Sequence, residues 1–151
     1  EVVIGQRLLR RICPQCRYSF TMPINEAHKL FTGAKDFFPG SAPVLMYRGK
    51  GCEACGGTGF RGRIGIYELL VITPEIEELI VRRASSSDLN VLARKQGMKL
   101  LFEDGFDKVR AGMTTIEELM RVAAPPDVFF SNIAGTTSAL SNSSGGKKKH
   151  A

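Results

Sequence analysis

The sequence predicts an α+β fold: a small tetracysteine module, then a short strand, a helical C-terminal domain and a disordered tail. Three observations support this prediction. All four cysteines occur as two CxxC pairs, with 35 residues between the pairs. After the second pair, a period of two begins at Phe60 and gives way to helical periodicity with capping residues. Of the 16 residues 131–146, 12 are Ser, Thr, Asn or Gly, a composition typical of disorder.

The composition limits the size and class of the protein. With 151 residues, 43% hydrophobic and 24% charged, the chain is long enough for one ordinary domain or two small ones. Lys and Arg outnumber Asp and Glu by 21 to 15, a net charge of +6 that permits an anionic partner without requiring one. No apolar run approaches the roughly 20 residues that span a bilayer, and residues 1–11 lack the pattern of a signal peptide. We therefore expect a soluble, cytoplasmic protein.

The two CxxC pairs predict a structural zinc site formed by Cys13, Cys16, Cys52 and Cys55. Two cysteines three positions apart reach one ion from a tight turn, and two such turns supply the four thiolates of a closed tetrahedral site. Disulfides are not expected without an export signal, and a redox-active CxxC needs a βαβ context that the sequence lacks. Four thiolates leave no open position for water. Zinc would therefore stabilise a loop-rich module, residues 13–59, without taking part in chemistry.

The elements before Phe60 are expected to be short. Val2–Ile4 is typical of a buried strand, and Gln6–Ile12 of a short basic helix that leads into the first cysteine pair. Residues 1–12 therefore look like the end of a larger domain. Between the cysteine pairs, Pro and Gly interrupt the chain often and leave room for one helix near Asn25–Phe31 and one strand at Val44–Tyr47.

Residues 60–123 are predicted to form a strand and four helices. From Phe60 to Ile66, apolar residues and a glycine alternate with arginines, as in a half-buried strand. Thr73 followed by Pro74 is a typical cap and first turn of a helix. The residues expected to face inward from this helix are Ile76, Leu79 and Ile80.

Three further helices follow. One is expected from Ser87 to Gln96, where Gly97 stops it. The next begins at Met98, has a regular apolar stripe and ends at Gly112, and the last opens on a capping box of Thr115 and Glu118. The inward-facing residues of the three are expected to be Leu89, Leu92, Ala93, Met98, Leu101, Phe102, Gly105, Phe106, Val109, Ile116, Leu119, Met120 and Ala123. Pro125 and Pro126 close the folded part, and residues 124–151 are predicted to form a disordered tail.

Two other classes of function fit parts of the sequence. Arg61 and Arg63, with the basic segment before the first cysteine pair, fit a nucleic-acid-binding zinc ribbon, but the aromatic residues that stack on bases are missing. The sequence CEACGGTG at 52–59 fits one unit of the zinc-dependent chaperone modules of DnaJ-type proteins, but the unit is not repeated. His28 could replace a cysteine ligand, although four cysteines suffice. We expect no nucleic-acid partner.

The sequence offers no candidate catalytic residue. A phosphate-binding GxxxxGK[ST] loop is absent, because neither Gly49-Lys50 nor Gly146-Lys147 is followed by Ser or Thr. With the cysteines assigned to a metal and no partner evident for His28, a nucleophilic triad is not expected either. As an isolated chain, this protein is not expected to be an enzyme.

Three stretches together resemble the C-terminal part of the secretion ATPases that power type II secretion and type IV pilus assembly. They are GQRLLRRICPQC at 5–16, GCEACGGTGFRGRIGIYELL at 51–70 and ARKQGMKLLFEDGFDKVRAGMTTIEELMRV at 93–122. The second is the most specific, because it joins a CxxC pair to the Gly-Phe-Arg-Gly-Arg strand. Residues 124–151 have no counterpart in this resemblance.

The resemblance implies more than the residues show. Members of this family are cytoplasmic hexameric motors at the inner membrane, which bind ATP and Mg²⁺ in a RecA-like core. That core would lie before Glu1, so residues 1–12 would be its end and the parent protein would be the ATPase. The family's zinc module corresponds to Cys13, Cys16, Cys52 and Cys55, and its helical C-terminal region to residues 74–123. The implied partners are other subunits of the hexamer and inner-membrane platform proteins.

Overall fold

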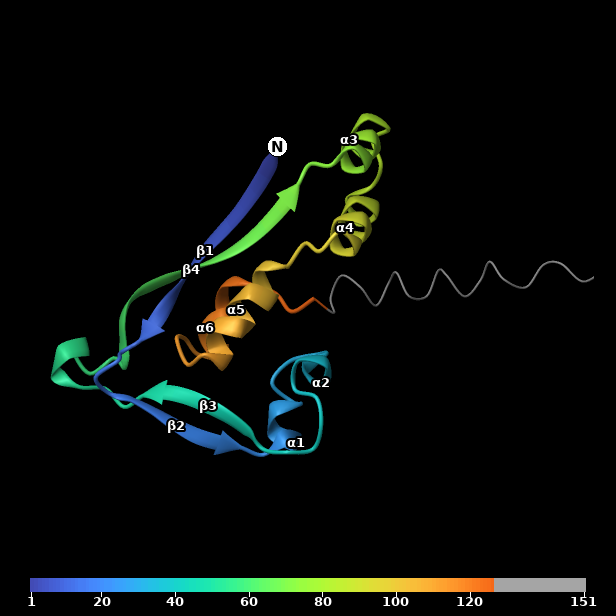
Figure 1. Cartoon of the computed structure of the whole chain (residues 1–151). Helices are drawn as coiled ribbons and strands as arrows, with labels where there is room; N and C mark the ends of the chain where they lie inside the picture. Colours follow the sequence, from blue (N-terminus) through green and yellow to red (C-terminus); the bar gives the residue numbers. More distant parts are fainter. Residues whose placement is uncertain (127–151) are drawn as a thin grey trace, which may run out of the picture.

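The computed structural model describes residues 1–126 and has the predicted mixture of helices and strands (Figure 1). The predicted disordered tail, 124–151, lies almost wholly outside the described residues. In chain order the elements are β1 (Val2–Ile12), β2 (Arg17–Met22), α1 (Ile24–Ala27), α2 (Ala34–Phe37), β3 (Val44–Gly49), the 3-10 helix η1 (Glu53–Cys55), β4 (Phe60–Val71), α3 (Pro74–Val81), α4 (Ser86–Lys95), α5 (Leu101–Arg110) and α6 (Ile116–Val122).

Two antiparallel ribbons organise the molecule. β1 pairs with β4 from Val2 opposite Val71 to Ile12 opposite Phe60, and β2 pairs with β3 from Arg17 opposite Gly49 to Met22 opposite Val44. The ribbons diverge from the end that carries the cysteines, and α5 and α6 lie between them (Figure 1). The helices α3 and α4 lie at the far end of the β1–β4 ribbon, near the N-terminus.

The predicted helix at Gln6–Ile12 is wrong, because β1 continues as a strand to Ile12. The helical appearance came from Leu9 and Ile12, which lie three positions apart and are both buried. A bulge between Arg10 and Ile12 explains this spacing. The extra residue turns both side chains to the same side of the strand, which mimics one face of a helix.

The predicted limits of the helices agree with the structure to different degrees. The four helices after β4 were all predicted, and Thr73 and Thr115 cap α3 and α6 by accepting the N–H groups of Ile76 and Glu118, each at 3.3 Å. Met98 precedes α5, which begins only at Leu101. Between the cysteine pairs, α1 is shorter than expected and α2 was not predicted.

One core joins the segment between the cysteine pairs to the C-terminal helices. Phe31, Phe37 and Phe38 surround Phe102 and Phe106 of α5, with edge-to-face ring contacts as short as 4.9 Å between centroids. Such contacts stabilise a core beyond the burial of apolar area alone. The core cluster also includes Leu9 of β1, Ile66 of β4 and Leu119 of α6.

The core leaves no space for a side chain at position 105. A Cβ atom on Gly105 would lie 2.2 Å from Cδ1 of Leu119, so α5 and α6 approach each other over a glycine. Across residues 1–126, no helix is long and apolar enough to cross a bilayer.

Candidate metal centre

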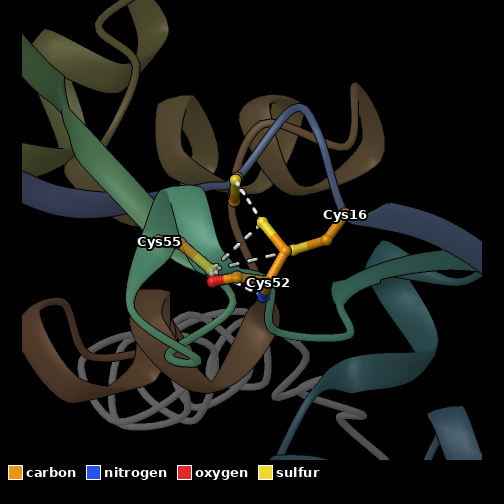
Figure 2. A group of neighbouring side chains, drawn as sticks. Cys16, Cys52 and Cys55 are labelled. Atoms are coloured by element: carbon orange, nitrogen blue, oxygen red, sulfur yellow. Dashed lines mark hydrogen bonds between the residues drawn. The ribbon is translucent and has the colours of Figure 1, made fainter.

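The four cysteines meet where the two ribbons join. Cys13 and Cys16 lie in the turn between β1 and β2, while Cys52 precedes η1 and Cys55 ends it. Their Sγ atoms all lie within 4.8 Å of one another. Figure 2 shows the side chains of Cys16, Cys52 and Cys55 pointing toward one another from the two turns. Residues far apart in the sequence thus form one sulfur cluster.

The spacing of the sulfur atoms fits a tetrahedral zinc ion. The Sγ–Sγ distances are 3.8 Å for Cys13 and Cys52, 3.9 Å for Cys16 and Cys55, and 3.7 Å for Cys52 and Cys55. A disulfide has sulfurs about 2.05 Å apart, so none of these contacts is one. With Zn–S bonds of about 2.3 Å, a regular tetrahedron has an S–S edge of about 3.8 Å. The donor set therefore fits Zn²⁺ in type, number and separation.

Backbone amides stabilise negative charge in the second turn. The N–H groups of Cys52 and Gly59 donate to Sγ of Cys55 at 3.2 and 3.3 Å. The Cys52 amide is the main reason why the pKa of Cys55 is lowered to about 6. Burial instead raises the pKa of Cys16 to about 11. Four neighbouring thiolates repel one another, so a cation is what lets all four lose their protons together.

The two turns are held together through glycine backbones. A Cβ atom on Gly49 would lie 2.2 Å from the carbonyl oxygen of Gly59, so the end of β3 lies against the residue before β4. The same carbonyl accepts the N–H of Cys13 at 2.9 Å, and Lys50 donates its N–H to the carbonyl of Cys16 at 3.0 Å. The role of Gly49 could not be predicted from the sequence, because its partner Gly59 is ten positions away and only the fold brings the two together.

An ion-pair network around the buried carboxylate of Glu118 links the end of β1 to α6. The Glu118 carboxylate accepts the backbone N–H of Arg10 at 3.1 Å and its guanidinium at 2.6 Å, and also the guanidinium of Arg121 at 3.1 Å. The hydrogen bond from the Arg10 side chain lowers the pKa of Glu118 to about 2. The predicted capping box is therefore only half formed: Thr115 caps α6, but the Glu118 carboxylate goes to Arg10.

The remaining candidates lie apart from the sulfur cluster. His28 follows α1 and its Nε2 donates to the carbonyl of Phe38 at 2.9 Å, so it is engaged elsewhere. Arg61 and Arg63 are exposed on β4, as expected of a solvated strand face. Neither forms an ion pair with any other part of residues 1–126.

Comparison with known proteins identifies the family. A family model described as "Type II/IV secretion system protein" matches residues 1–121. The chain belongs to this family. The resemblance seen in the sequence is thereby confirmed.

Relatives in this family carry names of both systems. The chain is 41% identical over 118 residues to "Type IV pilus assembly ATPase PilB" of Thermus thermophilus, covering 78% of this chain and 13% of that protein. It is 38% identical over 120 residues to "Type II secretion system ATPase E" of Vibrio cholerae, covering 80% of this chain and 22% of that protein. "Type II secretion system protein E" of Pseudomonas aeruginosa is 37% identical over 120 residues, with the same coverage of 80% and 22%. The chain thus spans about an eighth to just over a fifth of these relatives' lengths.

Proposed function

We propose that this chain is the zinc-stabilised C-terminal region of a bacterial ATPase that powers type II protein secretion or type IV pilus assembly. The observation that supports this most is a sulfur cluster with tetrahedral zinc spacing in a chain of the type II/IV secretion family. Relatives named as the ATPases of both systems support the parent activity. ATP and Mg²⁺ would bind in the part of the parent that lies outside this chain.

Within this proposal, Cys13, Cys16, Cys52 and Cys55 hold one structural Zn²⁺. The ion ties the turn between the two ribbons to the turn at η1, and its binding energy adds to the free energy of folding. Because four thiolates complete the coordination, the ion holds these turns in place and activates no water. The division of the chain is part of the same proposal: 1–12 ends the ATPase core, 13–59 is the zinc module, and 60–123 is the strand and four-helix C-terminal domain.

The proposed role of this region is to transmit motion of the ATPase core to other subunits of a hexamer or to inner-membrane platform proteins. The contacts of the turn between α5 and α6 support this role. Ile12 donates its N–H to the carbonyl of Met113 at 2.9 Å, and Thr114 donates its hydroxyl to the carbonyl of Arg10 at 2.8 Å. A displacement of β1 would therefore carry the helices with it. The site of action would be the cytoplasm, at the inner membrane through partners.

The proposal predicts that the 151-residue chain has no ATPase activity of its own, whereas the complete open reading frame encodes a phosphate-binding Walker A loop before Glu1 and hydrolyses ATP. Phosphate release measured on both purified proteins checks this. Turnover by the short chain, or a complete frame that lacks a phosphate-binding loop, would contradict the proposal.

Titration with DNA and RNA at two salt concentrations distinguishes the proposed function from the nucleic-acid-binding alternative. Binding through phosphates weakens steeply as salt rises, because counterions are released. The proposed function predicts no such binding. Within residues 1–126, Arg10, Arg48 and Arg121 pair with glutamates, whereas the exposed Arg61 and Arg63 form no ion pair, so the titration decides between the two functions.

A further inference from the structure

The start of α5 and the end of α6 border a cavity of about 450 Å³, which we call the α5–α6 cavity. Phe102 in its lining is 1% exposed and belongs to the core cluster. Leu101 and Val122 pack against that cluster but are only half-buried. Further apolar side chains in the lining are Leu100, Ala123 and Ala124. The volume is in the range of cavities that hold a ligand, and the apolar lining suits an apolar occupant.

The described part of the chain ends at this cavity. Ala123, Ala124 and Pro126 follow α6 and form one side of the lining. Pro125 and Pro126 are half-buried, so the chain still lies against the molecule after α6 has ended. Proline fixes the backbone φ angle, so fewer conformations of this connection are lost when the residues that follow it become ordered.

The residues that follow Pro126 include a short apolar segment. Val128, Phe129 and Phe130 are consecutive and begin two positions after Pro126. An extended chain spans at most about 3.6 Å per residue, so Phe130 reaches at most about 14 Å from Pro126. This reach suits a cavity that Pro126 itself lines. The composition typical of disorder, rich in Ser, Thr, Asn and Gly, begins only at Ser131.

The charges at the cavity favour the same segment. Arg7 of β1 is part of the lining and forms no ion pair with any residue of 1–126. The carboxylate of Glu68, also in the lining, accepts the N–H of Leu101 at 3.1 Å and is thereby held at the start of α5. Asp127 directly follows Pro126 and carries a carboxylate that can pair with Arg7. Because Arg7 is exposed, this pair would add little energy, but it favours one direction of entry.

We propose that Val128, Phe129 and Phe130 fold back onto the same chain and fill the α5–α6 cavity, with Asp127 beside Arg7. Aromatic side chains remove a large apolar area from water when they are buried, and this stabilises the docked segment. A connection of a few residues gives an effective concentration in the millimolar range, so the attached segment is favoured over that of a second copy or an unattached partner. The docked segment clamps the end of α6 to the start of α5.

Tryptophan fluorescence tests this inference directly. The chain contains no tryptophan, so Phe129→Trp and Phe130→Trp each report on one position. In the 151-residue chain, at least one of these two tryptophans is expected to emit at shorter wavelength than that of Leu140→Trp, and to be quenched severalfold less by acrylamide. Leu140→Trp is the matched control, because Leu140 lies in the stretch rich in Ser, Thr, Asn and Gly.

Two results of the fluorescence experiment would overturn the inference. One is that both tryptophans are as accessible to acrylamide as that of Leu140→Trp. The other is that protection disappears on dilution, because the cavity would then be filled by the segment of a second copy.

A pair of double variants gives an independent readout on the body of the molecule. Phe129→Ser with Phe130→Ser is expected to lower Tm and to speed amide exchange in residues 100–104 at least about tenfold, because the cavity opens to water. Ile133→Ser with Leu140→Ser is the control, since it also removes two apolar side chains from the residues after Pro126 and is expected to change neither quantity. Equal behaviour of the two double variants would contradict the inference.

The inference goes beyond the proposed function and does not depend on it. The docking segment lies outside residues 1–121, which the family model matches. Its tests need no nucleotide and no other part of a longer protein. An exposed segment would therefore leave the proposed function standing, and a complete protein without ATPase activity would leave the inference standing.

Discussion

Glu118 is a buried carboxylate held between two arginines. Its side chain is only 3% exposed, whereas those of Arg10 and Arg121 are 53% and 57% exposed. Such an arrangement removes the carboxylate from water and replaces its hydration with charge-assisted hydrogen bonds. It also links the end of β1 to α6, because one of the donors is the backbone N–H of Arg10.

We predict that Glu118→Gln lowers the free energy of unfolding by about 2 to 3 kcal/mol at pH 7, since it leaves Arg10 without its charge partner and removes the benefit of the lowered pKa. Chemical denaturation of the zinc-bound chain measures this loss. Glu117→Gln is the control, because Glu117 is 55% exposed and its ion pair with Arg48 lies at the surface. Its loss is expected to stay below about 1 kcal/mol.

The effect of Glu118 depends on pH in a defined direction. Folding lowers the pKa of Glu118 from its ordinary value of 4.5 to about 2. The stabilisation is therefore complete above about pH 4.5 and declines as the pH falls toward 2. The difference in unfolding free energy between wild type and Glu118→Gln should shrink over this interval. Loss of zinc in acid affects both proteins alike, so a difference that stays constant from pH 6 to pH 3 would contradict this account.

At the scale of elements, the contact between β3 and the start of β4 depends on the absence of a side chain at position 49. We predict that Gly49→Ala lowers Tm and weakens zinc binding, because the new methyl group would overlap the Gly59 backbone. Overpacking of this kind costs typically 1 to 3 kcal/mol. Competition with a zinc chelator measures the affinity, and thermal denaturation measures the stability.

Gly5→Ala is the matched control for Gly49→Ala. A Cβ atom on Gly5 would lie 3.6 Å from Cβ of Glu68, an ordinary contact, on the same kind of extended strand. This variant is expected to keep both Tm and zinc affinity. Equal effects of the two substitutions would show that loss of glycine in a strand, and not the approach of the two turns, causes any change.

Local signals explain which elements could be predicted from the sequence. The helices α3 and α6 were predicted because Thr73 and Thr115 act on N–H groups only three residues away. The strand β1 was partly predicted as a helix because a bulge, which exists only through pairing with β4, changed its periodicity. α2 was missed because it is four residues long and its one phenylalanine, Phe37, is ordered by contact with α5.

The same distinction holds for the candidate site. The cysteines could be predicted because each pair is a local pattern with one dominant chemical interpretation. The network of Arg10 and Glu118 could not, since its members are 108 positions apart and each looks like an ordinary surface charge. The contact of Gly49 with Gly59 is also a product of the fold, because it arises only when the two turns meet.

At the scale of the whole molecule, the sulfur cluster lies where the two ribbons join, and α5 and α6 fill the space between them (Figure 1). The segment between the cysteine pairs and the helices share one core, so loss of the proposed metal should loosen the helices as well as the turns. This unity follows from Phe31, Phe37 and Phe38, which come from between the cysteine pairs and pack on α5.

X-ray absorption at the zinc edge of the purified 151-residue chain, together with its zinc content, tests the central claim most directly. The account predicts one zinc per chain with four sulfur neighbours at about 2.3 Å. Cys13→Ser should lose the metal and lower Tm, while Ala54→Ser, within the second CxxC pair, keeps both. A chain without bound zinc, a first shell of nitrogen or oxygen, or a Cys13→Ser variant that keeps its metal and stability would contradict it.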